Sequence, residues 1–336
     1  MQKGGTRLTK YVGPLKFDGP SIYEDGNLNF DVIILFFGLG AFAGLARADL
    51  RLPTGLFESL SLYLLLALGL KGGVELARFP LGDVMLQAIP VVSLGFLLPL
   101  LCYPVLRRLG RLPAADSASI AAHYGSVSVA TFAVGIAHLD SLGISYEAYL
   151  PVFVVLLEMP AIGVGIWLAR RAGVGRKGGA SLAHEVFLNK GILLMGGGLL
   201  IGAVAGPSGA EPIAPVFVDL FKGVLALFLV EMGFIAASRL KDLRELGVFL
   251  LAFGTLMPLV GAALGALAGT LAGLSSGGVM VVATLGASAS YIAVPAAMRM
   301  AIPEARHHLS ITLSLAITFP FNVLVGIPLY TNLLVR

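Results

Sequence analysis

The sequence is poor in cysteine and in charge. Its 336 residues include a single cysteine, Cys102, and only 12% charged residues. One cysteine excludes an internal disulfide and a cysteine-based metal site. The formal net charge of +4 is too small and too dispersed for a nucleic-acid-binding surface. We therefore predict that the protein has no nucleic-acid partner.

Motifs for enzymatic chemistry are also missing. The chain contains no glycine-rich phosphate loop, no zinc-type spacing and no nucleophilic serine motif. His307 and His308 are adjacent, and adjacent residues on a helix point about 100° apart, so these two cannot hold one metal ion together. The sequence predicts that the protein is not an enzyme and has no cofactor.

Apolar residues are what the chain has in excess. Hydrophobic residues make up 57% of it, and it contains 43 glycines, a composition typical of a multi-pass membrane protein. We predict an all-α membrane protein with residues 1–30 as an exposed N-terminal tail, without the apolar core of a signal peptide, and residues 171–185 as a cytoplasmic linker. The apolar runs predict ten transmembrane helices, near residues 31–47, 54–77, 83–108, 115–137, 146–170, 186–206, 214–238, 243–272, 275–299 and 304–334.

Small polar residues interrupt the fourth and ninth of these helices. Gly125-Ser-Val-Ser128 lies in the first run, and Ala287-Ser-Ala-Ser290, followed by Pro295, lies in the second. Pro295 removes a backbone donor and pushes the residue before it out of helical geometry, so we expect it to contribute to the second interruption. A helix broken at membrane depth exposes peptide groups, which are tolerated only inside protein or beside a watery cavity. We predict two broken helices that cross at a binding site for a polar solute. The alternative is a pair of kinked structural helices packed through small residues.

The two interrupted segments lie about 160 residues apart, and the same spacing relates other parts of the chain. This spacing predicts two five-helix repeats, residues 31–170 and 186–336. Because five is odd, the second repeat enters the membrane from the opposite side and the repeats are inverted. The other related pairs are Gly72 with Gly233, Arg78 with Arg239, Glu58 with Asp219, and Met159-Pro160 with Phe319-Pro320.

Loop cations predict the orientation. Fourteen fall on one side of the predicted helices and seven on the other, so the positive-inside rule places the first side in the cytoplasm. Both termini are then extracytoplasmic, and we expect the protein in a bacterial inner membrane. The fourteen are Arg47, Arg51, Arg107, Arg108, Arg111, Arg170, Arg171, Arg176, Lys177, Arg239, Lys241, Arg244, Arg299 and Arg306.

Ionisable residues inside the predicted spans are candidates for function, because charge is costly in lipid. Glu158 lies in the middle of its run, near Pro160, and could bind sodium, carry a proton or make a structural hydrogen bond. At the equivalent place in the second repeat, Thr318 and Asn322 offer neutral oxygens to a cation.

His123 and Glu231 also fall inside predicted spans. Either could line a cavity. We expect a structural role for His123 and an interhelical contact for Glu231.

Several short segments resemble the sodium-dependent bicarbonate transporter family first known from cyanobacteria. The resemblance covers residues 30–335 and implies core helices 3–5 and 8–10, gate helices 1, 2, 6 and 7, a homotrimer, and a PII-like cytoplasmic regulator. The segments are Gly69-Leu-Lys-Gly-Gly73, Gly125-Ser-Val-Ser128, Ile144-Ser-Tyr-Glu-Ala148, Leu220-Phe-Lys-Gly223, Met232-Gly233, Ser238-Arg239, Ser288-Ala-Ser290 and Ala301-Ile-Pro303.

The resemblance also implies where the substrate and ion bind. Glu158 matches an acidic position of the family and would serve a sodium ion, with Thr318 and Asn322 as further oxygen donors. The family pattern has an acidic residue where this chain has Tyr291, and a glycine where it has Val294. This departure predicts fewer coupled sodium ions or a shifted substrate. The anion would lie among Ser126, Val127, Ser128, Ser288, Ala289, Ser290 and Tyr291, and Ser126 and Ser128 would also face the sodium ion.

Together these features predict a secondary transporter that imports a small anion, with bicarbonate as the first choice, by sodium symport and an elevator-like movement of the core. A proton- or sodium-coupled transporter of a small organic anion is the alternative within transport. A channel or a non-transporting membrane receptor is the alternative from another class. Alternating access through inverted repeats favours the carrier.

Overall fold

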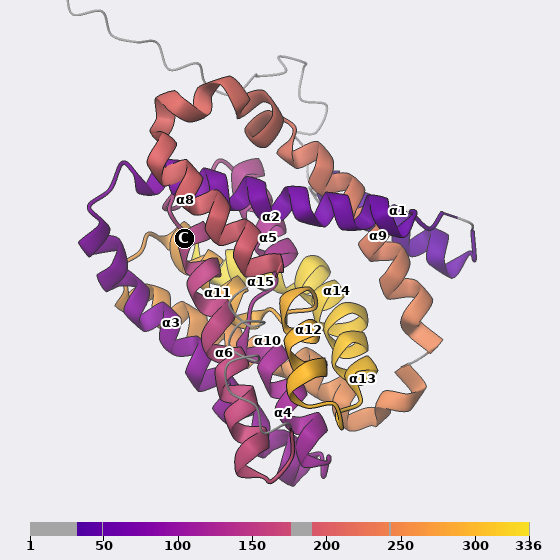
Figure 1. Ribbon diagram of the computed structural model, residues 1–336. Coiled ribbons are helices and arrows are strands. Elements are labelled where there is room, and N and C mark those ends of the chain that lie inside the picture. Colours follow the sequence, from indigo (N-terminus) through magenta and orange to yellow (C-terminus); the bar gives the residue numbers. More distant parts are fainter. Residues whose placement is uncertain (1–31, 49, 176–189, 242, 336) are drawn as a thin grey trace, which may run out of the picture. The chain divides into compact units, whose positions relative to one another are not determined.

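A computed structural model describes residues 32–48, 50–175, 190–241 and 243–335, and these residues form helices without any strand (Figure 1). The chain divides into residues 1–30 and residues 31–336, and only the second unit is described below. The predicted tail at 1–30, most of the predicted linker at 171–185 and the cations Arg176 and Lys177 lie outside the described residues.

The helices follow the apolar runs of the sequence. In the first half they are α1 (Val32–Leu45), α2 (Thr54–Leu76), α3 (Leu81–Pro104) with a π-helical extension (Val105–Leu109), α4 (Ala114–Gly125), α5 (Val129–Ser141) and α6 (Pro151–Arg171). In the second half they are α8 (Lys190–Ala210), α9 (Phe221–Ser238), α10 (Leu243–Leu271), α11 (Ser276–Ala287) and α12 (Ala293–Ala301). The last helical segment runs from α13 (His307–Thr312) through α14 (Phe319–Phe321) to α15 (Ile327–Leu334), with π-helical turns at Leu313–Thr318 and Asn322–Gly326.

Within the described residues, eight helical segments are long and apolar enough to cross a membrane. Two shorter apolar helices, Val32–Leu45 and Ser276–Ala287, complete the set of predicted segments. An all-helical, multi-pass membrane protein is therefore confirmed. Of the predicted starts, residues 31 and 186 lie outside the described residues, so the first helix is seen from Val32 onward and the sixth from Lys190 onward.

Two details of the prediction were wrong. The fifth helix begins at Pro151 rather than at residue 146, because Pro151 suits the first helical position, where no backbone N–H is needed. The interruption of the ninth helix lies at residues 288–292, and Pro295 sits in the first turn of α12. Proline is tolerated in a first turn, so Pro295 does not make the break.

Close backbone contacts join α1 to α9 and α2 to α8. A Cβ atom at Gly69 would collide with the Met195 carbonyl oxygen of α8, and one at Gly40 would collide with the Val230 carbonyl oxygen of α9. Small residues at such crossings allow helix backbones to approach closely in a membrane. The two helix pairs are therefore held by main-chain contact as well as by side chains.

The α10–α11 pair also packs closely through glycines. Gly261, Gly265 and Gly269 recur every fourth residue on α10 and face α11, where Gly286 meets Gly261 backbone to backbone. Every residue of α11 from Gly277 to its end at Ala287 is buried. The segment that leads into the second interruption thus lies inside the protein.

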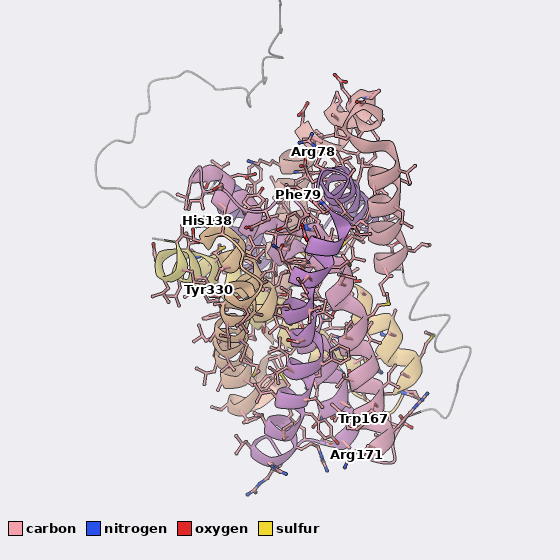
Figure 2. All side chains as sticks on the ribbon, turned by 90° about the vertical axis from the view of Figure 1, so that its left-hand side faces the viewer. Arg78, Phe79, His138, Trp167, Arg171 and Tyr330 are labelled. Carbon is pink, nitrogen blue, oxygen red and sulfur yellow. The ribbon has the colours of Figure 1, made fainter. Side chains whose placement is uncertain are left out.

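Figure 2 shows Trp167 and Arg171 at one end of the helices and Arg78 and Phe79 at the other. The topology predicted from the sequence assigns most loop cations to the side of Arg171, and we call this side the arginine-rich end. The described arginines assigned to it are Arg47, Arg51, Arg107, Arg108, Arg111, Arg170, Arg171, Arg239, Arg299 and Arg306.

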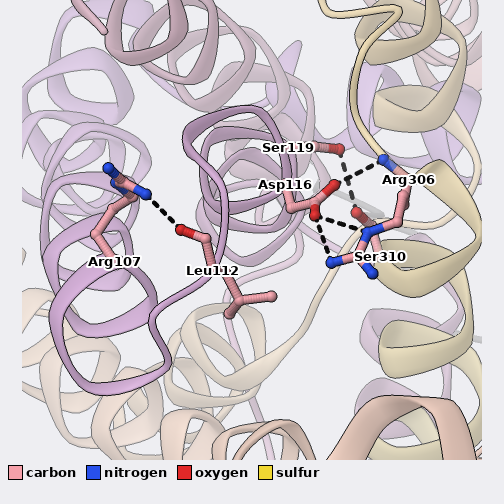
Figure 3. A network of polar contacts seen from close by, with 6 residues as sticks. All are labelled: Arg107, Leu112, Asp116, Ser119, Arg306 and Ser310. Carbon is pink, nitrogen blue, oxygen red and sulfur yellow. Dashed lines mark hydrogen bonds and ion pairs between the residues drawn. The ribbon is translucent and has the colours of Figure 1, made fainter.

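A buried carboxylate organises part of the arginine-rich end. Asp116, in the first turn of α4 and 3% exposed, accepts hydrogen bonds from the Arg306 backbone N–H at 2.7 Å and from its Nε at 2.9 Å (Figure 3). The Arg306 Nη2 atom lies 2.7 Å from the same carboxylate. One turn further along α4, the Ser119 hydroxyl lies 3.1 Å from the Ser310 hydroxyl of α13. These bonds fix the start of the last helical segment against the start of α4.

Candidate functional site

Both predicted interruptions exist, and they have the same local conformation. The first separates α4 from α5 and the second separates α11 from α12. Ser126 and Ser288, the residues that follow α4 and α11, are extended, with φ of −87° and −84° and ψ of 175° and 165°. Neither conformation needs a glycine, because extended backbone is open to any residue. The extended segments carry the chain across the interior before the next helix begins.

The two interruptions are hydrogen-bonded to each other. The Ser128 N–H donates to the Ser288 hydroxyl at 2.9 Å, and the Ser290 N–H donates to the His123 carbonyl oxygen at 2.8 Å. Buried peptide groups need partners, and here each interruption satisfies groups of the other. Segments that lie about 160 residues apart in sequence therefore form one structural unit.

Some polar groups at this crossing remain unpaired among the described residues. The Val127 and Ala289 N–H groups, each in the middle of an extended segment, donate to no described residue. The buried Ser126 hydroxyl likewise has no partner. Buried polar groups are hydrogen-bonded in most proteins, so these donors indicate a place where a ligand completes the bonding.

Tyr291 follows the second extended segment, and its hydroxyl is buried without a hydrogen-bond partner among the described residues. The hydroxyl lies close to the Ser128 side chain, but the geometry does not make a hydrogen bond. The ring packs edge to face on Phe319, with the centroids 5.7 Å apart. Tyr291 thus brings an unused donor to the crossing, and the structure places it with the other predicted anion-binding residues.

The N-terminus of α5 lies at the crossing. Ser128 is its N-cap, and the Ser128 side-chain oxygen accepts the Thr131 N–H at 3.1 Å. A helix N-terminus carries a partial positive charge from its aligned peptide dipoles. An anion at the crossing would therefore be favoured by this helix as well as by the unpaired donors.

Glu158 lies beside the first interruption. α6 runs antiparallel to α4: Cβ atoms added at Gly165 and at Gly125 would meet Ala122 and Ala161, respectively. Glu158 precedes Ala161 by about one turn of α6, so this register places Glu158 level with the extended segment that follows α4. The carboxylate is 2% exposed, and its Oε2 atom has no hydrogen-bond partner among the described residues.

Thr318 and Asn322 reach the crossing region but are already bonded. The Thr318 hydroxyl donates to the Gly254 carbonyl oxygen at 2.9 Å and lies 2.5 Å from the Tyr124 hydroxyl. The Asn322 amide donates to the Ala287 carbonyl oxygen at 2.8 Å. That these two residues contribute oxygens to a sodium site stays a prediction.

Sequence reasoning missed Tyr124 and Tyr330. Tyr124 precedes the first interruption and binds Thr318, and the Tyr330 hydroxyl donates to the Asn322 side-chain oxygen at 3.1 Å. A hydroxyl in an otherwise apolar run was the available signal in both cases. Their partners are distant in sequence, so the signal did not say what they bind.

His123 and Glu231 each make a contact within the protein, but the buried Nε2 atom of His123 has no partner among the described residues, and Glu231 contacts the α1–α2 connection rather than another helix. The His123 Nδ1 atom lies 2.7 Å from the Ser119 carbonyl oxygen. A Glu231 carboxylate oxygen accepts the Leu52 N–H at 2.9 Å and so holds the α1–α2 connection against α9.

A cavity of about 670 Å³ is lined by Tyr291 and Ile292, which follow the second extended segment, and by Arg51 and Arg239. Arg51 lies in the α1–α2 connection, and Arg239 follows α9. Tyr291 thus borders a space that has two cationic residues in its wall. We call this space the vestibule.

These features define the class of the protein. It is a multi-pass helical membrane protein in which two interrupted helices meet at a buried polar site, the arrangement found in many secondary transporters. The sequence model of the Na⁺-dependent bicarbonate transporter superfamily matches residues 32–335, nearly the whole chain. The protein belongs to this family, which is a family of transporters and not of enzymes. Comparison with curated proteins found no match.

Proposed function

We propose that the protein imports a small anion, with bicarbonate as the first choice, in symport with sodium. Membership of the Na⁺-dependent bicarbonate transporter superfamily supports this proposal. The observation that carries it is the crossing, where the N-terminus of α5 lies together with the unpaired Val127 and Ala289 N–H groups and the unpaired Ser126 hydroxyl. Donors without acceptors beside a positive dipole end suit an oxyanion and not a cation.

The anion would lie between the two extended segments. Its oxygens would accept hydrogen bonds from the Val127 and Ala289 N–H groups, the Ser126 hydroxyl and the Tyr291 hydroxyl. The full proposed set is Ser126, Val127, Ser128, Ser288, Ala289, Ser290 and Tyr291.

Sodium would bind near Glu158. A buried carboxylate with an unpaired oxygen is costly to keep charged without a cation, so binding of Na⁺ and of the anion would favour each other. The proposed oxygen donors around the ion are Glu158, Ser126, Ser128, Thr318 and Asn322. A proton on Glu158 would meet the same need, and this keeps proton coupling as the second candidate.

Two inverted repeats would explain the pattern of helix contacts. If α1 corresponds to α8 and α2 to α9, then the α2–α8 contact is equivalent to the α9–α1 contact. In the same way the α3–α4 contact corresponds to the α10–α11 contact. Each contact has its counterpart, which supports repeats of opposite orientation.

The contacts also support an elevator movement. The proposed gate consists of α1, α2, α8 and α9, and the proposed core contains the remaining helices. The α1–α9, α2–α8 and α10–α11 pairs pack through glycine backbones, whereas the contact between Phe37 of the gate and Phe319 of the core is made by side chains. Lys222 of α9 and Asp140 of α5 form one such contact, 3.2 Å long and with both side chains partly exposed, and an exposed ion pair contributes little to stability.

Tyr146, in the connection between α5 and α6, binds the acidic partner of the Lys222–Asp140 ion pair. Its hydroxyl donates to the Asp140 carboxylate at 2.9 Å. Burial and the nearby Asp140 carboxylate raise the pKa of Tyr146 above its ordinary value, so the phenol stays protonated and remains a donor.

Orientation and assembly complete the proposal. The excess of cations places the arginine-rich end in the cytoplasm and both termini outside, in a bacterial inner membrane. From the family resemblance we propose a homotrimer and a PII-like cytoplasmic regulator. The mass of the purified detergent complex tests the trimer.

Uptake of labelled bicarbonate into proteoliposomes tests the function. We expect accumulation when sodium is higher outside, and little when the sodium gradient is replaced by potassium. Accumulation driven by a proton gradient alone would favour the second candidate. Currents beyond the turnover of a carrier would indicate a channel, and binding without flux would indicate a receptor.

A further inference from the structure

The vestibule differs in charge from the site that it leads to. Arg51 and Arg239 line it, and no aspartate or glutamate side chain does so among the described residues. Its other walls include the apolar Ile292 and Leu315. A cleft with charges of one sign and low-dielectric walls concentrates ions of the opposite sign.

Neighbouring groups anchor the Arg239 side chain and the backbone next to Arg51. The Leu52 N–H, next to Arg51, is bound by the buried Glu231 carboxylate at 2.9 Å, which anchors this part of the α1–α2 connection. Arg239 uses Nη1 to donate to the Thr312 hydroxyl at 3.2 Å. A guanidinium has five N–H donors, so Arg239 keeps several for another acceptor.

We propose that Arg51 and Arg239 form a second anion-binding station, at which a planar oxyanion such as bicarbonate or a carboxylate is held between the arginine-rich end and the crossing. This proposal rests on the proposed function, because it assigns a route to the same substrate. A guanidinium binds a planar carboxylate-like group through two parallel N–H···O bonds, which matches the shape of bicarbonate. The two residues are specificity-determining and do not belong to the crossing itself.

The proposed orientation puts the station on the cytoplasmic side, so an imported anion would reach it after leaving the crossing. The crossing offers N–H and hydroxyl groups, which discriminate weakly between an anion and a neutral solute at long range. Two arginines on the release side add attraction that reaches about 8 Å at physiological ionic strength. Charge selection in the vestibule would then act on anions that leave toward, or approach from, the arginine-rich end, and hydrogen-bond selection would occur at Ser126 and Tyr291.

A thiol placed in the vestibule measures this charge without any need for transport. Ser238 lines the vestibule, and its hydroxyl makes only a local bond to the Ile235 carbonyl oxygen, at 2.9 Å. The C102A/S238C protein would be reacted with an anionic and with a cationic methanethiosulfonate reagent. We expect the anionic reagent to react faster relative to the cationic one, and R51Q/R239Q to lower this ratio by roughly tenfold or more.

Arg108→Gln is the matched control, because Arg108 is an exposed arginine of the same end that does not line the vestibule. An unchanged ratio in R51Q/R239Q, or an equal fall in R108Q, would overturn the proposal.

A second assay addresses the transported anion. In vesicles of defined orientation, R51Q/R239Q should raise the bicarbonate KM about tenfold from the arginine-rich side and leave the KM from the other side unchanged. Equal effects from both sides would contradict the station. If the unmodified protein does not transport bicarbonate, the proposed function fails, while the reagent ratio still decides whether the vestibule selects anions.

Discussion

Two serines at the crossing should respond differently to the same substitution. Ser126 and Ser288 occupy equivalent places in the two interruptions, but their hydroxyls have different surroundings. The Ser126 hydroxyl is buried and unpaired among the described residues. The Ser288 hydroxyl accepts the Ser128 N–H at 2.9 Å and donates to the Leu285 carbonyl oxygen at 2.8 Å. The first is available to a ligand, and the second is used by the protein.

Ser126→Ala should therefore impair transport and leave stability unchanged. A hydrogen bond to a charged group is worth about 1.5–3 kcal/mol. At about 1.4 kcal/mol for each factor of ten, its loss raises the KM for the anion roughly 10- to 150-fold. Removal of an unpaired buried hydroxyl leaves no protein partner behind, so the midpoint of thermal unfolding in detergent should not fall.

Ser288→Ala, in contrast, should lower the stability of the protein. It leaves the buried Ser128 N–H without an acceptor, which costs about 1–3 kcal/mol of stability. We expect a lower unfolding midpoint for Ser288→Ala than for Ser126→Ala, measured on the same preparation as the bicarbonate uptake.

Ser117→Ala provides the control for an unpaired hydroxyl that is distant from the site. Ser117 is buried and unpaired like Ser126, and it lies about 13 Å earlier along α4. Its substitution should change neither KM nor stability. A normal KM for Ser126→Ala, or an equal rise for Ser117→Ala, would refute the assignment of Ser126 to the anion.

Three further substitutions test the cation, the departure from the family and the fold. Glu158→Gln should weaken the sodium dependence of uptake, because a neutral amide lacks the charge attraction; uptake that responds to sodium as before would exclude Glu158 from the cation site. Tyr291→Asp should steepen the sodium dependence or change the preference between bicarbonate and monocarboxylates, with Tyr291→Phe as the control for packing; if a folded Tyr291→Asp protein changes in neither respect, Tyr291 serves packing alone. Asp116→Asn should destabilise the protein by about 1–2 kcal/mol, as it loses charge-assisted bonds to the half-exposed Arg306 side chain, and chemical unfolding measures this loss.

Local chemistry explains why the helices and the interruptions could be predicted from the sequence. Runs of apolar residues specify helices in lipid, and Gly125-Ser-Val-Ser128 breaks such a run with small residues that tolerate extended backbone. Pro295 was misleading for the same local reason, since proline both ends helices and begins them. Its first-turn position depends on where the helix restarts, which a single proline does not determine.

The partners at the site could not be predicted, because they depend on tertiary contacts. Thr318 and Asn322 offer oxygens in the sequence, but in the folded chain the Thr318 hydroxyl bonds to Tyr124 and Gly254, and the Asn322 side-chain oxygen accepts from Tyr330. The Ser128–Ser288 bond joins two residues that are not equivalent, because the spacing pairs Ser126 with Ser288; the predicted crossing did not indicate which atoms would meet. Periodicity shows which segments are equivalent, and packing decides which atoms meet.

The bonding around the crossing bears on how such a site could face each side of a membrane in turn. The interruptions bind each other through Ser128 and Ser288, and the last helical segment reaches both of them, through Thr318 to Tyr124 and through Asn322 to Ala287. Opening the site between its two halves would break these buried bonds, at a cost of about 1–3 kcal/mol for each polar group left unpaired. Moving the whole unit past α1, α2, α8 and α9 leaves these bonds intact; it breaks the exposed Lys222–Asp140 pair and rearranges apolar contacts such as that between the Phe37 and Phe319 rings. Apolar surfaces can pack against new neighbours, whereas a buried polar group that loses its partner stays unpaired. This difference is the reason why we propose an elevator rather than a movement that separates the two interrupted helices.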